Sequence, residues 1–158
     1  MQTGPISTGP ISDGEAMALC VQVLGAANAL LDGIHAGVMA RGFADLRPSH
    51  GFAFARLAPG DATISELAVH MGVTRQAAAQ LVDELVTKGY VERRPHPQDR
   101  RAQLIVLTER GWACTRAAEA AAADTVARWA AQAGEDRLRA CQAALAGITP
   151  TGRLRPTW

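Results

Sequence analysis

Residues 63–108, TISELAVHMGVTRQAAAQLVDELVTKGYVERRPHPQDRRAQLIVLT, decide the fold of this chain. The first half of this segment has the pattern of two short helices joined by a turn at Gly72. Thr63 and Glu66 have the spacing of a capping box, in which each side chain bonds the main-chain amide of the other residue. Thr74 is placed to cap the second helix, whose periodicity predicts that Ala77, Ala78, Leu81, Val82 and Leu85 are buried. These signals predict a helix-turn-helix.

The second half of the segment predicts a β-hairpin. The stretches YVERR (90–94) and RRAQLIVLT (100–108) have the composition of strands, and PHPQD (95–99) between them carries two prolines that stiffen a turn. A helix-turn-helix followed by such a hairpin is a winged helix-turn-helix, in which the hairpin is the wing.

Helical periodicity extends the prediction on both sides of this segment. We expect helices over about 16–39 and 48–57 before it, and over about 109–133 and 135–148 after it. The expected fold class is therefore mainly α with a small β-hairpin wing.

The first of these helices is apolar around much of its circumference. Such a helix must be covered from more than one direction, which its own domain and a partner subunit together would do. Its length would also suit a bilayer, but Gln22, Asn28 and Asp32 interrupt it and basic flanks are absent. We interpret it as an interface helix and expect no membrane contact.

The whole-chain charge says little about partners, because the formal net charge of the 158 residues is only +1. Locally the balance differs. Between Lys88 and Gln103 there are five cations against two acids, a net charge of +3. This local surplus is the pattern of a phosphate-binding surface.

The cysteines indicate a reducing compartment. Cys20, Cys114 and Cys141 lie far apart and are odd in number, which does not suit a disulfide framework. The N-terminus lacks the pattern of a secretory signal. We therefore expect a cytoplasmic protein.

Two groups of side chains are candidates for contacting DNA. The N-terminal part of the second helix of the helix-turn-helix presents amide, hydroxyl and guanidinium groups suited to base edges and phosphates, and the hairpin presents arginines suited to the backbone and the minor groove. Asp99 is expected to pair with an arginine and orient it. The candidate residues are Thr74, Arg75, Gln76, Gln80, Arg93, Arg94, Arg100 and Arg101.

Three stretches together resemble the MarR family of bacterial transcriptional regulators. GYVERRPHPQDRRAQLIVLTERG (89–111) is similar to the wing of that family, with its Asp-x-Arg tip and Leu-Thr strand end. LRPSHGFAF (46–54) and TISELAVHMGVTRQA (63–77) resemble the family's second, third and fourth helices. The order of elements matches from about residue 15 to 148.

The resemblance implies a homodimeric repressor that binds a pseudo-palindromic operator in double-stranded DNA. Arg101 would enter the minor groove, Asp99 would brace it, and the helix after Thr74 would recognise the major groove, with half-sites about 34–36 Å apart. In one place the chain departs from the family, because AAAQ (77–80) is poorer in polar residues than the common version.

The resemblance also implies a division of the chain into functional regions. These regions are a flexible arm (1–14), a helical dimerisation region (15–42 and 109–148), a winged helix-turn-helix DNA-binding domain (43–108) and a C-terminal tail (149–158).

The resemblance implies two alternative signals that would relieve repression, a small ligand or an oxidant. Family members often respond to small aromatic or phenolic ligands in a cleft between the dimer helices and the DNA-binding lobe, which His35 and His50 would line. A subset senses peroxide through a cysteine near the start of the first helix, a place comparable to that of Cys20. That branch uses tyrosines to activate the cysteine, whereas the only tyrosine here is Tyr90, and packing is the competing explanation for Cys20.

Other function classes have less support in the sequence. We find no phosphate-binding loop, nucleophile elbow or metalloprotease helix, so we expect neither an enzyme nor a cofactor. The four histidines show no metal-ligand spacing, so no metal is expected. A winged helix that binds another protein is the remaining alternative, although it would not need cations on both the wing and the exposed helix.

Overall fold

The computed structural model describes residues 9–99 and 101–149. It confirms a mainly helical fold with a small antiparallel sheet. In chain order, the elements are α1 (Asp13–Ala40), α2 (Pro48–Leu57), β1 (Ala62–Thr63), α3 (Ile64–Met71), α4 (Arg75–Thr87), β2 (Val91–Pro95), β3 (Gln103–Leu107), α5 (Glu109–Ala133) and α6 (Glu135–Ile148).

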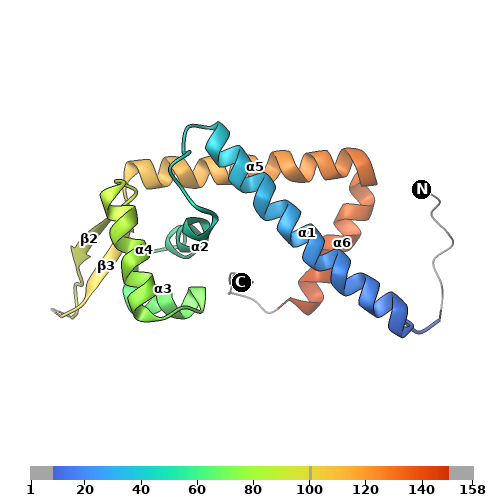
Figure 1. Cartoon of the computed structure of the whole chain (residues 1–158), viewed down its shortest axis with the longest axis horizontal. Coiled ribbons are helices and arrows are strands. Elements are labelled where there is room, and N and C mark those ends of the chain that lie inside the picture. Colours follow the sequence, from blue (N-terminus) through green and yellow to red (C-terminus); the bar gives the residue numbers. More distant parts are fainter. Residues whose placement is uncertain (1–8, 100, 150–158) are drawn as a thin grey trace.

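The winged helix-turn-helix occupies one end of the molecule. Figure 1 shows α2, α3, α4 and the β2–β3 hairpin gathered there, while α5 runs from this lobe along the length of the molecule. Helix α1 packs against α5, and α6 turns back after Gly134, whose φ of 91° breaks the helix. Helices α1, α5 and α6 therefore form an arm outside the lobe.

The helix ends follow the capping signals in the sequence. The Thr63–Glu66 capping box is formed before α3, and the Thr74 and Thr108 side chains accept main-chain amides at the starts of α4 and α5. Ser12 forms a capping box with Glu15, so α1 begins three residues earlier than its apolar periodicity predicted. Gly72 ends α3 with a φ of 67°, in the left-handed region that only glycine adopts freely.

The sheet has one strand that the sequence did not predict. Within the described residues, the strand order is β1-β3-β2 and both pairings are antiparallel. Strand β1 has only two residues, whose partners are Ile105 and Leu104. So short a segment shows no alternation pattern, and its pairing depends on partners in β3 that lie 43 and 41 residues further along the chain. The hairpin thus becomes a three-stranded sheet.

Helices α1 and α5 approach closely because two glycines face α5. A Cβ added at Gly33 would lie 2.7 Å from Thr125 Oγ1, and one added at Gly37 would lie 2.5 Å from the Cβ of Ala121. Such distances are too short for packed atoms, so a larger residue at either position would push the helices apart. The four-residue spacing of the two glycines places them on one side of α1.

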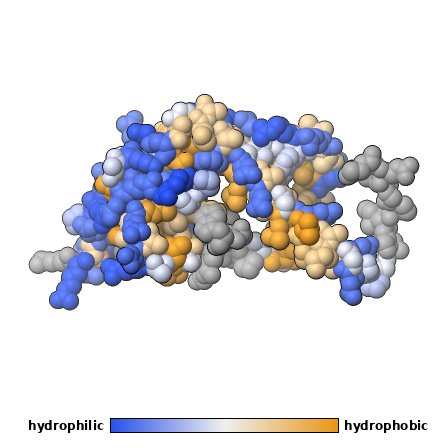
Figure 2. All heavy atoms as spheres, viewed as in Figure 1, coloured by the Kyte–Doolittle hydropathy of each residue, from blue (hydrophilic) through white to orange (hydrophobic). Residues whose placement is uncertain are grey.

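The chain itself covers little of the apolar surface of α1. Of the residues of α1, all of which the structure describes, Val38 alone is buried. Helix α1 is long and apolar enough to cross a membrane, and none of its most apolar window is buried within the chain. Its exposed large apolar residues include Met17, Leu19, Val21, Val23, Leu24 and Leu31. Figure 2 shows apolar residues gathered at the end of the molecule where α1 and α6 lie.

Candidate nucleic-acid interface

Helix α4 presents its N-terminal side chains to solvent. Thr74, Arg75, Gln76 and Gln80 are all exposed, as a helix that enters a groove requires. Ala77 is exposed as well, although helical periodicity had suggested that it is buried. The core side of α4 is formed by Ala78, Val82 and Leu85, as helical periodicity predicted. We call Thr74, Arg75, Gln76, Ala77 and Gln80 the α4 strip.

The wing is joined to α4 by an ion pair. Arg93 Nη2 lies 2.6 Å from Asp83 Oδ1 on α4, and Arg93 Nη1 donates to Gln103 Oε1 at 3.2 Å. Arg93 was expected to contact DNA, but in the free protein its guanidinium is engaged by α4 and β3. Sequence reasoning missed Asp83, since nothing in the local pattern indicates a partner ten residues away.

Arg94 lies on the opposite face of the hairpin from Arg93, because neighbouring strand residues point to opposite sides. Its guanidinium pairs with Glu92, which is on the same face, at 2.5 Å. The two arginines therefore do not form a single cationic surface.

The wing turn is organised around main-chain amides. Asp99 Oδ1 accepts from the main-chain N–H of Arg101 at 2.9 Å, so this contact fixes the backbone of Arg101 and does not involve its guanidinium. His96 Nδ1 accepts from the amides of Gln98 and Asp99 at 3.2 and 3.1 Å. Asp99 thus has a main-chain partner where an arginine side chain was expected. His96, which the sequence placed in the turn, is one of the residues that form it. Arg100 lies outside the described residues.

A polar cluster holds the base of the wing against α5. Tyr90 Oη donates to Asp45 Oδ1 at 2.6 Å. Arg110 donates to Asp45 Oδ2 at 3.2 Å and to Tyr90 Oη at 3.1 Å, and its guanidinium carbon lies 4.4 Å from the centre of the Tyr90 ring. Burial and the contact with Asp45 raise the pKa of Tyr90 to about 12, so it stays protonated. Gly111 completes the contact, since a Cβ there would clash with the Tyr90 carbonyl oxygen.

A second cluster surrounds Glu84 on α4. Its carboxylate accepts from Lys88 Nζ at 2.7 Å and pairs with Arg47, which precedes α2. His50 Nε2 lies 3.4 Å from Glu84 Oε2. The hydrogen bond from Lys88, with the nearby charges of Arg47 and Lys88, lowers the pKa of Glu84 to about 2. The carboxylate therefore links α4 to the start of α2.

His50 is fully buried and neutral. Burial lowers its pKa more strongly than the neighbouring Glu84 raises it. Its Nδ1 accepts from the main-chain N–H of Arg47 at 3.0 Å, so its proton is on Nε2, which faces Glu84. His50 was expected to line a ligand cleft, but the structure places it among these polar groups instead.

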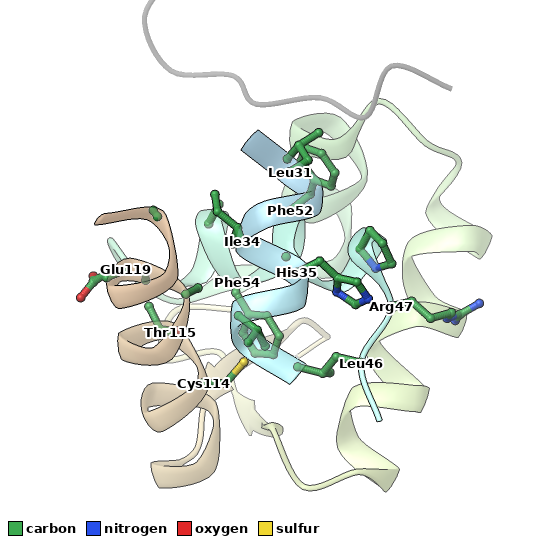
Figure 3. A pocket seen from close by; sticks show the side chains of 17 residues that line it. Leu31, Ile34, His35, Leu46, Arg47, Phe52, Phe54, Cys114, Thr115 and Glu119 are labelled. Atoms are coloured by element: carbon green, nitrogen blue, oxygen red, sulfur yellow. The ribbon is translucent and has the colours of Figure 1, made fainter. Parts of the chain in front are cut away.

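A pocket with a volume of about 370 Å³ lies between α1, α2 and α5. Figure 3 shows Phe52 and Phe54 from α2, Ile34 and His35 from α1, and Cys114 and Thr115 from α5 around it. Arg47 also lines it, and the Glu119 carboxylate points away from the labelled apolar side chains. His35 lines this pocket, whereas His50 is not among the lining residues.

The cysteines differ in environment. Cys114 is buried beside the pocket, and burial raises the pKa of its thiol to about 11, which leaves it protonated and unreactive. Cys20 and Cys141 are exposed. Among the residues that the structure describes, no three His, Cys, Asp or Glu side chains gather in a way that would hold a metal ion.

Comparison with known proteins gives this site its context. A sequence model of the MarR family matches residues 52–102, which run from α2 to the wing turn. The chain resembles the crystal structure of RV1404 from Mycobacterium tuberculosis, with a TM-score of 0.73 and 26% identity over 92% of this chain and 98% of that one. The winged helix-turn-helix segment of this chain, residues 52–102, is that of the MarR family.

Other MarR-family structures share the fold. Wild-type MarR from E. coli in its apo form has a TM-score of 0.67 and 21% identity, over 90% of this chain and 100% of that one. A mutant MarR from E. coli, solved in complex with operator DNA, also has a TM-score of 0.67, with 22% identity over 88% of this chain and 100% of that one. The chain thus has the fold of MarR-family transcription regulators.

A relative that matches this chain in sequence has no assigned activity. The uncharacterized protein Rv2011c from Mycobacterium tuberculosis is 36% identical over 95 residues, which are 56% of this chain. The match spans only 66% of the length of that relative.

Proposed function

We propose that this chain is a homodimeric, sequence-specific DNA-binding transcriptional repressor of the cytoplasm. The observation that carries the proposal is the Asp83–Arg93 pair, which holds the exposed α4 strip and the basic wing on one lobe. The operator complex of the related E. coli MarR supports DNA as the partner. Family membership favours a regulator over an enzyme.

On DNA, the α4 strip would enter the major groove and the wing would follow the backbone. Thr74, Arg75, Gln76 and Gln80 provide donors and acceptors for bases and phosphates. Arg101, whose backbone Asp99 holds, would insert into the adjacent minor groove, where the potential is most negative. Arg94 and Arg100 remain candidate backbone contacts, and Arg93 would position the wing through Asp83.

The proposed dimer covers the exposed apolar faces of α1, α5 and α6. Exposed apolar patches of this kind mark interfaces in proteins that do not enter membranes. On α6, Ile148 is 77% exposed and Leu145 is 39% exposed. Figure 2 shows apolar residues gathered where α1 and α6 lie. A two-fold arrangement would bury these faces and give two wings for a pseudo-palindromic operator.

We propose that the pocket binds a small aromatic or phenolic effector that carries an acidic group. Aromatic and aliphatic side chains line it, and the nearby cation is Arg47, which pairs with Glu84 of α4. An anionic ligand would compete with Glu84 for Arg47. Loss of that pair would free α4 to move relative to α2, which lowers DNA affinity.

Oxidant sensing through Cys20 is a second candidate, because the Cys20 side chain is exposed and open to oxidants. Peroxide treatment that releases operator DNA from the wild type but not from Cys20→Ser would support it. Unchanged operator binding after peroxide would exclude it.

The main test is selection of bound duplexes from a random DNA pool, followed by gel shift and size-exclusion chromatography. A palindromic consensus with half-sites about one helical turn apart would support the proposal. Indifference to DNA at low salt would overturn it and favour a winged helix that binds another protein. Transcription from a promoter that carries the selected operator would separate repression from activation.

A further inference from the structure

The middle of the α4 strip is short and uncharged. Gln76, Ala77 and Gln80 are exposed and adjacent, because residues three or four apart lie on one helix face. The structure describes every residue of α4. Arg75, the first residue of the helix, is its one cation before the C-terminal cap at Lys88. The centre of the strip therefore presents two carboxamides and a methyl group.

The acids of α4 do not change this character. Asp83 is paired with Arg93 at 2.6 Å, and Glu84 is held by Lys88 and Arg47. Both carboxylates are thus neutralised by cations from outside the strip. What remains available to a base edge at the centre of α4 is the side chains of Gln76, Ala77 and Gln80.

These groups match one kind of base pair. A glutamine carboxamide fits the N6 and N7 edge of adenine, whereas the major-groove edge of guanine is usually bound by arginine or lysine. A methyl side chain makes apolar contact with the C5-methyl group of thymine. The position of Ala77 is well fixed, since its main-chain N–H donates to Thr74 Oγ1 at 3.1 Å in the first turn.

We propose that Ala77 determines operator specificity by contacting a thymine methyl group, beside adenines bound by Gln76 and Gln80. This inference rests on the proposed DNA-binding function and gives it a base preference. The half-site is A·T-rich where the centre of α4 meets the major groove, and any guanine contact from α4 comes from Arg75 at its end.

The test replaces thymines in the selected operator, one symmetric pair at a time, with deoxyuridine. This change removes the C5-methyl group and leaves the hydrogen-bonding edges intact. Fluorescence anisotropy then measures the Kd of each duplex for the full chain. We expect one thymine position to lose about fourfold in affinity per half-site, the effect of one methyl group leaving an apolar contact.

Protein variants assign that methyl contact to a residue. Ala77→Ser replaces the apolar contact with a hydroxyl, and it should bind the thymine and deoxyuridine operators equally. Ala77→Gly, which removes the side chain, should also lose the discrimination. Ala79→Ser is the matched control, because Ala79 is half-buried on the same helix, and it should keep the difference of about fourfold per half-site. Circular dichroism checks that each variant is folded.

The outcomes separate this inference from the proposed function. If the wild type binds no selected sequence, both fail. If it binds a palindrome whose half-sites have no thymine, or tolerates deoxyuridine at every position, the proposed contact of Ala77 is wrong. The proposed DNA-binding function is then still supported. Discrimination that persists in both Ala77→Ser and Ala77→Gly would equally overturn it.

Discussion

Asp83 of α4 and Arg93 of the wing lie 2.6 Å apart and join the two elements expected to contact DNA. The Asp83 side chain is 69% exposed, so the pair contributes little to folding, on the order of 1 kcal/mol or less. Its consequence is geometric and electrostatic. It fixes the wing relative to α4 and neutralises a carboxylate that would otherwise face phosphates.

Removing Arg93 should therefore harm DNA binding by exposing Asp83. We expect Arg93→Ala to weaken operator affinity about tenfold, on the scale of one lost charge contact. Adding Asp83→Asn to Arg93→Ala should restore part of the affinity, because the unpaired negative charge is gone. Anisotropy titrations of both single variants and the double variant measure this coupling. Additive effects of the two substitutions would show that the pair has no role in binding.

The salt dependence of binding tests Arg101. We expect Arg101→Ala to weaken binding to all sequences and to reduce the slope of log K against log salt by about one unit. Arg139→Ala on α6 is the control, since Arg139 pairs with Glu135 and Asp136 far along the chain from the wing. A wild-type slope for Arg101→Ala would remove the wing tip from the interface.

The wing turn should depend on an acceptor at residue 96. His96→Ala leaves the amides of Gln98 and Asp99 without their partner and should weaken operator binding about fivefold, the scale of one hydrogen bond. His96→Asn keeps an acceptor suited to a turn and should bind nearly as well as the wild type. Hydrogen exchange of these two amides reports the turn directly. Equal exchange in His96→Ala and wild type would contradict the assignment.

The stability contributed by Glu84 should vary with pH. Its pKa falls from an ordinary 4.5 to about 2 on folding, so its contribution is complete above pH 4.5 and is lost as the pH falls toward 2. At pH 7, Glu84→Gln should lower the free energy of unfolding by up to about 3 kcal/mol, reduced by solvent screening of a carboxylate that is 29% exposed.

Urea unfolding at pH 7, 5, 4 and 3 measures the difference between Glu84→Gln and wild type, which should shrink as the pH falls. Asp136→Asn is the control, because that side chain is fully exposed on α6. A difference that stays constant over this range would show that the carboxylate charge is not responsible.

The α1–α5 contact should tolerate no side chain at residue 37. Gly37→Ala places a Cβ against Ala121 and should destabilise the protein by about 1–3 kcal/mol. Gly25→Ala is the matched control on the same helix, since its Cβ meets nothing within 4 Å in the chain. That variant should be neutral or about 0.5–1 kcal/mol more stable. Thermal unfolding compares the two, and equal melting temperatures would contradict the close packing.

Local signals in the sequence predicted the elements well, because caps and helix-ending glycines act over a few residues. Thr63 and Thr74 cap the helices they were expected to cap. The predicted burial of Ala77 was wrong, because three alanines in succession give no polar face from which to judge the orientation of the helix.

The contacts that organise the site were not predictable in the same way. Asp45 meets Tyr90, and Arg47 meets Glu84, across 45 and 37 residues. Such pairs depend on how the elements pack, and a single sequence does not show which distant residues come into contact. The bracing role of Asp99 was predicted, but its partner is a main-chain amide.

The close approach of Gly111 to Tyr90 has a mechanical consequence. There is no space for a side chain between them, and the Arg110 guanidinium lies over the Tyr90 ring. The wing and the first turn of α5 must therefore rotate as one body. Helix α5 is a rod of 25 residues, about 37 Å long. A tilt of about 5° at its far end would sweep the wing through about 3 Å, comparable to the spacing of adjacent base pairs. Small adjustments at the interface of the proposed dimer would thereby be amplified at the tip.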